Sequence, residues 1–169
     1  MTDIRPARES DAAALAAIGA ETFIETFGHL YTAKDIADFL EKNHSQAAYR
    51  ELLASGRHAL WLAENDGEPA GYCVVGPCTL PVPDMPGNSG ELSRLYFLKR
   101  SQGAGLGTRM LALALDWLDA HFEHVYLSVY SENYGAQRLY ARHGFVKVHD
   151  YFYMVGEHAD PEWIMGRSR

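Results

Sequence analysis

The pattern of hydrophobic and polar positions predicts a strand, a glycine-rich loop and a helix in succession near the middle of the chain. Residues 92–98 are rich in aromatic and branched side chains, which is typical of a strand. From residue 106 to about residue 122, apolar residues recur at intervals of four, three and four, which predicts a helix. These apolar residues are Leu106, Met110, Leu113 and Trp117. Three glycines fall within residues 103–107, where the two elements meet.

The rest of the chain continues this alternation and predicts an α/β (α+β) fold. Helices are predicted from a cap at Ser10 or Asp11 to about residue 26, at 33–42 after Thr32, at 46–54 after Ser45, and at 133–143. Strands are predicted at 4–7, 58–64, 70–75, 125–130, 145–155 and 162–165, with a tight hairpin turn at Asn65-Asp66-Gly67. A proline-rich loop precedes the central strand. This order indicates a mixed, mostly antiparallel sheet with one central βαβ unit and flanking helices.

The glycine-rich loop has the chemistry of a phosphate site. Glycines leave backbone N–H groups uncovered, and at the start of a helix the dipole and the unpaired donors favour an anion. A diphosphate suits the length of the loop. A Walker A loop is excluded because Gly107 is followed by Thr108 and Arg109 rather than by lysine. The dinucleotide-binding fingerprint fits poorly because the third glycine comes one residue early, so a nucleotide-binding domain is disfavoured.

Two motifs carry a resemblance to a known family. Gln102, Gly105 and Gly107 match the pattern Gln/Arg-x-x-Gly-x-Gly/Ala position by position. A second motif, N-x-x-A-x-x-x-Y-x-x-x-G-F, is matched downstream by Asn133, Ala136, Tyr140, Gly144 and Phe145. Together, over about residues 4–165, these motifs resemble the GNAT superfamily of N-acetyltransferases. The resemblance implies the GNAT fold, with a splayed central βαβ unit, and transfer of an acetyl group from acetyl-CoA to an amine.

The resemblance also implies which residues contact acetyl-CoA. A splayed and bulged strand end at Leu95, Tyr96 and Phe97 would offer backbone N–H groups to pantetheine and to the thioester carbonyl. The other cofactor-binding residues are Gln102, Gly103, Ala104, Gly105, Leu106, Gly107, Thr108, Asn133, Ala136 and Tyr140. The last three are spaced three and four apart, so they share one helix face. Cations for the 3′-phosphate are available at Lys99, Arg100, Arg109 and Arg142.

Tyr140 and Glu91 are the candidate catalytic residues. The Tyr140 hydroxyl would donate a hydrogen bond to the leaving sulfur, since full proton transfer from a phenol to a thiolate is uphill by about 2 kcal/mol. An amine with a pKa near ~10.4 must also lose a proton, which costs about 4.6 kcal/mol at pH 7. A general base would lower this barrier. Glu91, which opens the central strand, is the first candidate for the base, and Glu25 is the second.

A narrower resemblance concerns the acceptor. Residues 22–27, 91–96, 152–154 and 164–165 are similar to bacterial spermidine/spermine N-acetyltransferases, which implies a polyamine substrate. Phe23 and Phe27 lie four apart on a predicted helix, with Glu25 on another face. Aromatic rings can enclose an alkyl chain and face a cation, so these residues and Tyr31 are the candidate substrate-binding residues. The alternative is that both phenylalanines belong to the core.

Composition narrows the class of protein. A length of 169 residues favours a single domain over residues 1–169. The net charge of −7 argues against a nucleic-acid partner and suits a cationic substrate. No apolar run approaches the ~18 residues that span a membrane, and no signal region stands at the N-terminus, so a cytoplasmic protein is expected. Cys73 and Cys78 have no metal-site spacing, so no metal is predicted.

Two other functions stay open at this point. One is a catalytically silent module of the GNAT fold that binds acyl-CoA or regulates another protein, although Tyr140 and Asn133 argue against it. The other is an acetyltransferase of protein N-termini or lysines. The sequence also leaves the oligomeric state open, a homodimer included.

Overall fold

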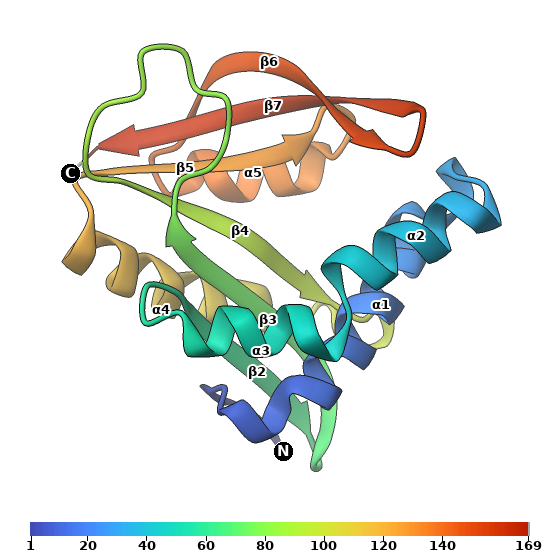
Figure 1. Ribbon diagram of the computed structural model, residues 1–169. Coiled ribbons are helices and arrows are strands. Elements are labelled where there is room, and N and C mark those ends of the chain that lie inside the picture. The colour runs from blue at the N-terminus through green and yellow to red at the C-terminus, as the bar shows by residue number, and fades with distance from the viewer. Residues whose placement is uncertain (169) are drawn as a thin grey trace.

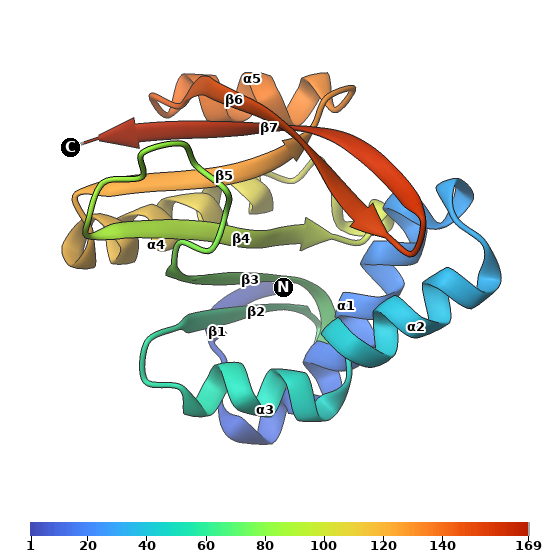
Figure 2. The ribbon, with the colours of Figure 1, turned by 45° about the horizontal axis from the view of Figure 1, so that its top comes forward.

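A seven-stranded sheet with helices on both faces forms the framework of the protein (Figures 1 and 2). The computed structural model describes residues 1–168. The strands are β1 (Thr2–Pro6), β2 (Ala59–Asn65), β3 (Glu68–Pro77), β4 (Ser89–Phe97), β5 (His124–Tyr130), β6 (Val146–Val155) and β7 (His158–Ser168). Their order across the sheet is β1-β2-β3-β4-β5-β7-β6, and β4 and β5 are the parallel pair. The predicted mixed, mostly antiparallel α/β architecture is therefore confirmed.

The helices pack on both faces of the sheet, and a hydrophobic cluster forms on each face. They are α1 (Ala12–Phe27), α2 (Ala33–Asn43), α3 (Gln46–Ala54), α4 (Leu106–His121) and α5 (Tyr134–Arg142), with short 3₁₀ turns η1 (Glu9–Asp11), η2 (Gly28–Leu30) and η3 (Lys99–Ser101). α4 and α5 pack on one face around Met110, Leu111 and Phe145. α1 and α3 pack on the other face around Leu15 and Tyr49. None of the helices within residues 1–168 combines the length and apolar composition that a bilayer crossing requires.

Local signals in the sequence place most element boundaries correctly. Thr32 Oγ1 accepts a hydrogen bond from Asp35 N at 3.1 Å, and Ser45 Oγ accepts one from Ala48 N at 3.1 Å, so both predicted caps are confirmed. The predicted hairpin turn joins β2 to β3. β7 begins before and ends after the predicted 162–165. At its start the strand continues through Pro161, which lies beyond the end of the ladder with β5 and pairs with β6 alone. A proline, which has no N–H, is tolerated at such a position.

The central βαβ unit opens toward one end of the sheet. β4 and β5 pair over only four residues each, Ser89–Leu92 with His124–Leu127. Beyond them β4 pairs only with β3, and β5 pairs only with β7. The splayed unit that the family resemblance implies is therefore confirmed. The divergence leaves one backbone edge of β4 without a strand partner, facing a gap between the two halves of the sheet.

A β-bulge in β4 decides which side chains face the α1 side of the sheet. In the ladder with β3, Val75 pairs with Leu92 and Val74 pairs with Arg94, so Ser93 is the extra residue. The bulge is therefore two residues earlier than the expected 95–97. In a regular strand Glu91 and Arg94 would point to opposite faces. The extra residue brings both to the same face.

Candidate functional site

Two adjoining cavities lie where the sheet splays. The larger has a volume of about 390 Å³ and lies between α1, α2, the loop after β3 and the β6–β7 hairpin. The smaller, about 190 Å³, is a groove between the diverging strands β4 and β5 and the start of α5. Seven residues line both: Phe27, Ser93, Arg94, Tyr96, Ser128, Tyr130 and Glu162. The two spaces therefore meet at a junction formed by α1, β4, β5 and β7.

The groove gathers most of the residues predicted to contact acetyl-CoA. Leu95, Tyr96 and Phe97 line it from β4, and Gln102, Asn133, Ala136 and Tyr140 line it from the loop and α5. Gln102 Nε2 donates to Phe97 O at 3.0 Å, which ties the glycine-rich loop to the strand end. Asn133 Oδ1 accepts from Ala136 N at 3.3 Å and caps α5. Asn133 therefore has a clear role in positioning α5.

Tyr140 has the environment of a hydrogen-bond donor. Its ring packs edge-on against Phe145, with ring centroids 6.0 Å apart. Its hydroxyl lines the groove and forms no hydrogen bond within residues 1–168, so it is not engaged by a backbone carbonyl. Burial raises the pKa of this phenol above its ordinary value. Tyr140 therefore stays protonated at neutral pH and can donate into the groove.

The glycine-rich loop has an open face at the start of α4. Gly105 stands before α4 with φ at +77°, and this end of the helix has no side-chain cap. An added Cβ at Gly103, Gly105 or Gly107 would meet no atom within 4 Å, so the loop has an open face. The first amides of α4 have no acceptor within the helix, which leaves them for an anion. These features, with the groove beside them, fit the diphosphate and pantetheine of CoA.

Three of the four predicted cations lie on the elements that flank this loop, Lys99 and Arg100 in η3 and Arg109 in the first turn of α4, whereas Arg142 is the last residue of α5. Arg100 pairs with Glu21 at 3.2 Å. Within residues 1–168, Lys99, Arg109 and Arg142 form no ion pair and so are available to a phosphate.

The larger cavity has an aromatic wall supplied by the first half of the chain. The Phe23 ring lies 4.5 Å from that of Phe39, 5.5 Å from that of Phe27 and 5.8 Å from that of Tyr31, between centroids. The structure thus places Phe23, Phe27 and Tyr31 together in one cavity wall. Glu25 is not part of that wall, because its Oε2 accepts a hydrogen bond from Lys99 N at 2.8 Å and holds η3 against α1.

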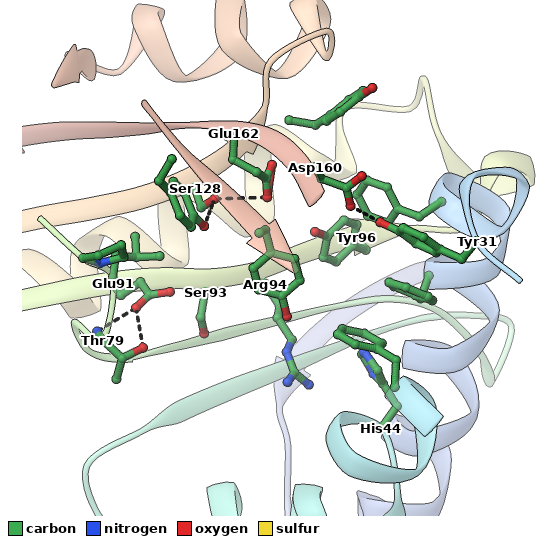
Figure 3. A pocket seen from close by; sticks show the side chains of 18 of the residues that line it. Tyr31, His44, Thr79, Glu91, Ser93, Arg94, Tyr96, Ser128, Asp160 and Glu162 are labelled. Atoms are coloured by element: carbon green, nitrogen blue, oxygen red, sulfur yellow. Dashed lines mark hydrogen bonds between the residues drawn. The ribbon is translucent and has the colours of Figure 1, made fainter. Parts of the chain in front are cut away.

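Three carboxylates face the larger cavity (Figure 3). Glu91, 7 % exposed, accepts hydrogen bonds from Thr79 N at 2.9 Å and Thr79 Oγ1 at 3.2 Å, and burial raises its pKa. Asp160 accepts a hydrogen bond from the Tyr31 hydroxyl and lies 2.9 Å from His158 Nε2.

Glu162 is the third carboxylate. Its Oε1 accepts a hydrogen bond from Ser128 Oγ at 3.2 Å. Burial raises its pKa to about 7, and the charge of Asp160 adds to the increase while Ser128 opposes it.

One arginine stands among these acids without a carboxylate partner. Arg94 donates from Nη1 to Asn43 O at 3.1 Å and to Tyr49 Oη at 3.0 Å, and within residues 1–168 it forms no ion pair. His44 shares the Tyr49 hydroxyl at 2.8 Å, and burial lowers the pKa of His44 to about 3, so this imidazole is neutral. The buried Tyr72 hydroxyl nearby has no partner among the described residues.

Asp160, Glu162 and Arg94 were not among the predicted site residues. A usable signal existed for the two acids, because residues two apart in a strand share a face. The predicted strand begins at residue 162, after the proline, so Asp160 falls outside it. Arg94 could not be placed, because its orientation depends on the bulge at Ser93.

Comparison with known proteins agrees with this geometry. Residues 25–145 match the family model described as Acetyltransferase (GNAT) family. An uncharacterised N-acetyltransferase of Mycobacterium bovis is 32% identical over 165 residues, which cover 94% of this chain and 98% of the relative. The spermine/spermidine N(1)-acetyltransferase of Bacillus subtilis is 33% identical over 84 residues, covering 47% of this chain and 54% of that protein.

Solved structures show the same fold. The PaiA N-acetyltransferase of Thermoplasma acidophilum, in complex with coenzyme A, superposes with a TM-score of 0.77 at 18% identity, covering 100% of this chain and 99% of the other. A GNAT acetyltransferase of Streptococcus pneumoniae superposes with a TM-score of 0.72 at 25% identity, covering 100% of both chains. With the matched family model and the relative of near-equal length, these findings show that the chain belongs to the GNAT family of acetyltransferases, which use acetyl-CoA as the acyl donor.

Proposed function

We propose that this acetyl-CoA-dependent N-acetyltransferase acts on a small primary amine that carries a second positive charge, a polyamine in particular. The observation that carries the proposal is the larger cavity, where an aromatic wall and three carboxylates surround a space of about 390 Å³ beside the CoA groove. Aromatic faces and carboxylates are the two kinds of group that bind an ammonium ion. The −7 net charge of the chain acts in the same direction.

The arrangement of the cavity suits a substrate with separated charges. Glu162 lies at the junction with the groove, where an amine must stand to reach a thioester. Asp160 lies on the same face of β7 two residues earlier, against Tyr31. A diamine can therefore present one nitrogen at the junction while its second nitrogen contacts Asp160. The partial relative from Bacillus subtilis, named for spermine and spermidine, supports the same substrate class.

The groove supplies the rest of the chemistry. Acetyl-CoA brings an activated acyl group, whose carbonyl oxygen gains negative charge during attack by the amine. Backbone N–H groups at the open edge of β4, at Leu95 to Phe97, are positioned to stabilise that charge, which is usually the largest catalytic contribution. Tyr140 donates a hydrogen bond to the departing sulfur. These roles extend the proposal to the reaction itself, direct attack of the amine on the thioester.

Arg94 favours a second candidate, an acceptor that also carries a carboxylate. A guanidinium in the cavity wall with no acidic partner in the described chain offers a place for such a group. An amino acid would satisfy Arg94 and the acidic residues at once. The polyamine is preferred because three carboxylates face the cavity and one arginine does.

A screen of acceptors tests the proposal. Thiol release from acetyl-CoA is measured with spermidine, spermine, short diamines, aminoglycosides, amino acids and lysine peptides, at low and high salt. We expect spermidine or spermine to give the highest kcat/KM, and their KM to rise with salt more than that of a monoamine. Turnover of amino acids, with polyamines at background, would contradict the polyamine and support the role of Arg94.

Two variants sharpen this screen. Asp160→Asn should raise the KM of a polyamine about 10-fold or more, and that of a monoamine much less, because only the longer substrate reaches Asp160. Glu123→Gln removes the same charge from an exposed position at the start of β5 and serves as the matched control. An equal change in both variants would mean that overall charge, and not the cavity, attracts the substrate.

A further inference from the structure

The junction between the two cavities holds one carboxylate. Of the seven residues that line both spaces, six are apolar, aromatic, hydroxylic or cationic, and the seventh is Glu162. Glu91 and Asp160 line the larger cavity alone. An amine attacking a thioester in the groove must pass through this junction, so Glu162 is the acid that can touch the reacting nitrogen.

The other two acids line only the larger cavity, and each contacts a neighbouring segment of the fold. Glu91 lies in the paired part of β4, between Gly76 of β3 and Tyr126 of β5, and holds the loop after β3 through Thr79. Asp160 is held by Tyr31 and His158. Glu162 uses only Oε1 for a hydrogen bond, and within residues 1–168 its Oε2 has no partner. Glu91 likewise bonds only through Oε1, so Glu162 is distinguished by its place in the lining of both cavities.

We propose that Glu162 is the general base that deprotonates the acceptor amine, and that Ser128 and Tyr151 position its carboxylate. Ser128 Oγ lies 2.6 Å from the Tyr151 hydroxyl and donates to Glu162 Oε1 at 3.2 Å. When Tyr151 donates to Ser128, the serine proton is directed at Oε1, which leaves Oε2 for the amine. Figure 3 shows the hydrogen bond between Ser128 and Glu162. The inference rests on the proposed function only in that the acceptor is an amine.

The proton balance of the step is complete without a further reactant. Glu162 Oε2 accepts one proton from the bound ammonium, and the freed lone pair forms the bond to the acetyl carbon. The carbon–sulfur bond breaks, and its electron pair leaves with the sulfur. The second proton of the nitrogen neutralises the thiolate, next to the hydroxyl of Tyr140. The proton on Glu162 then passes to water, which restores the carboxylate.

The surroundings of Glu162 make it a suitable base at neutral pH. Burial raises its pKa from an ordinary 4.5 to about 7, which makes proton transfer from an amine about 300-fold more favourable. The charged groups that face it are Asp160 on β7 and Glu91 and Arg94 on β4. The other titratable groups that line the cavity are neutral at this pH: the imidazole of His44 and the phenols of Tyr31, Tyr72, Tyr96, Tyr130, Tyr151 and Tyr153.

The pH dependence of three variants tests this role. Glu162→Gln keeps the shape of the side chain and removes its basicity, Glu91→Gln tests the rival base, and Glu123→Gln is the exposed control. The acceptor is whichever amine the wild-type enzyme acetylates fastest, so a failure of the polyamine proposal leaves this test intact. Binding of CoA, measured by calorimetry, confirms that each variant is folded.

We expect kcat/KM at pH 7 to fall by about 10²-fold or more in Glu162→Gln, within the range for general base catalysis. The inflection near pH 7 should disappear from its pH profile, so that the rate follows the free-amine fraction alone. In Glu91→Gln and Glu123→Gln the inflection should remain. An inflection that persists in Glu162→Gln, or that is lost in Glu91→Gln, would overturn the assignment. A ¹³C-NMR titration of labelled glutamates gives an independent readout. A Glu162 carboxyl that titrates near 4.5 would contradict the assignment of Glu162 as the general base.

Discussion

Replacing Gly105 with alanine separates backbone strain from ligand binding at the loop before α4. Gly105 has φ at +77°, a left-handed conformation that costs an alanine about 1–2 kcal/mol. An added methyl group meets no atom within 4 Å, so no steric clash adds to that cost. We therefore expect the free energy of unfolding to fall by about 1–2 kcal/mol and Tm to fall by about 2–8 °C.

The effect on CoA should be larger and of a different origin. The methyl group would stand on the open face of the loop, where a diphosphate must approach the first amides of α4. A hydrogen bond to a charged group contributes about 1.5–3 kcal/mol. Loss of one such bond therefore corresponds to a Kd for CoA that is about 10- to 150-fold higher.

Gly56 provides a matched control for the strain. It follows α3 with φ at +70°, and an added Cβ there also meets no atom within 4 Å. Gly56→Ala should lower Tm by a similar amount and leave the Kd for CoA unchanged. The assays are thermal unfolding without ligand and isothermal titration with CoA well below both transitions. An unchanged Kd in folded Gly105→Ala, or equal losses of affinity in both variants, would refute the diphosphate assignment.

Two further predictions concern a catalytic donor and acid stability. Tyr140→Phe retains the packing against Phe145 and removes the hydrogen-bond donor. We therefore expect kcat to fall by about 10²-fold while the Kd for CoA, measured by calorimetry, stays the same. Wild-type turnover in this variant would mean that the hydroxyl is structural. Arg5 holds the pKa of the Asp11 carboxyl at about 2, below its ordinary 3.8. The ionised Asp11 therefore contributes about 2 kcal/mol to the free energy of unfolding above pH 4, and this contribution is lost as the pH falls toward 2. Urea unfolding of Asp11→Asn should give a free energy of unfolding about 2 kcal/mol below wild type at pH 7, and this difference should narrow below pH 4. A difference that stays constant with pH would exclude the ion pair as the cause of the lost stability.

The sequence alone determined the parts of this protein that depend on local chemistry. Hydrophobic periodicity placed the helices, and short polar side chains placed the caps at Thr32 and Ser45, because such caps bond to amides two or three residues away. The glycine-rich loop and the spacing of Asn133, Ala136 and Tyr140 likewise depend on residues that are close in the chain. Together with the family resemblance, these local features were enough to predict the fold and the acetyl-CoA groove.

Only the tertiary structure brought the acid groups of the site together and showed which of them face the cavity. Glu25, midway between Phe23 and Phe27 in the sequence, holds η3 through Lys99 N. Glu162 and Asp160 come from β7, which is at least 129 residues away in the sequence from the aromatic wall at Phe23 and Tyr31. Long-range pairing with β5 brings this strand over the cavity. The orientation of Arg94 depends on one extra residue in β4. A one-residue change of register turns a side chain to the other face of a sheet, and register is set by the packing of the whole sheet, which no local pattern contains.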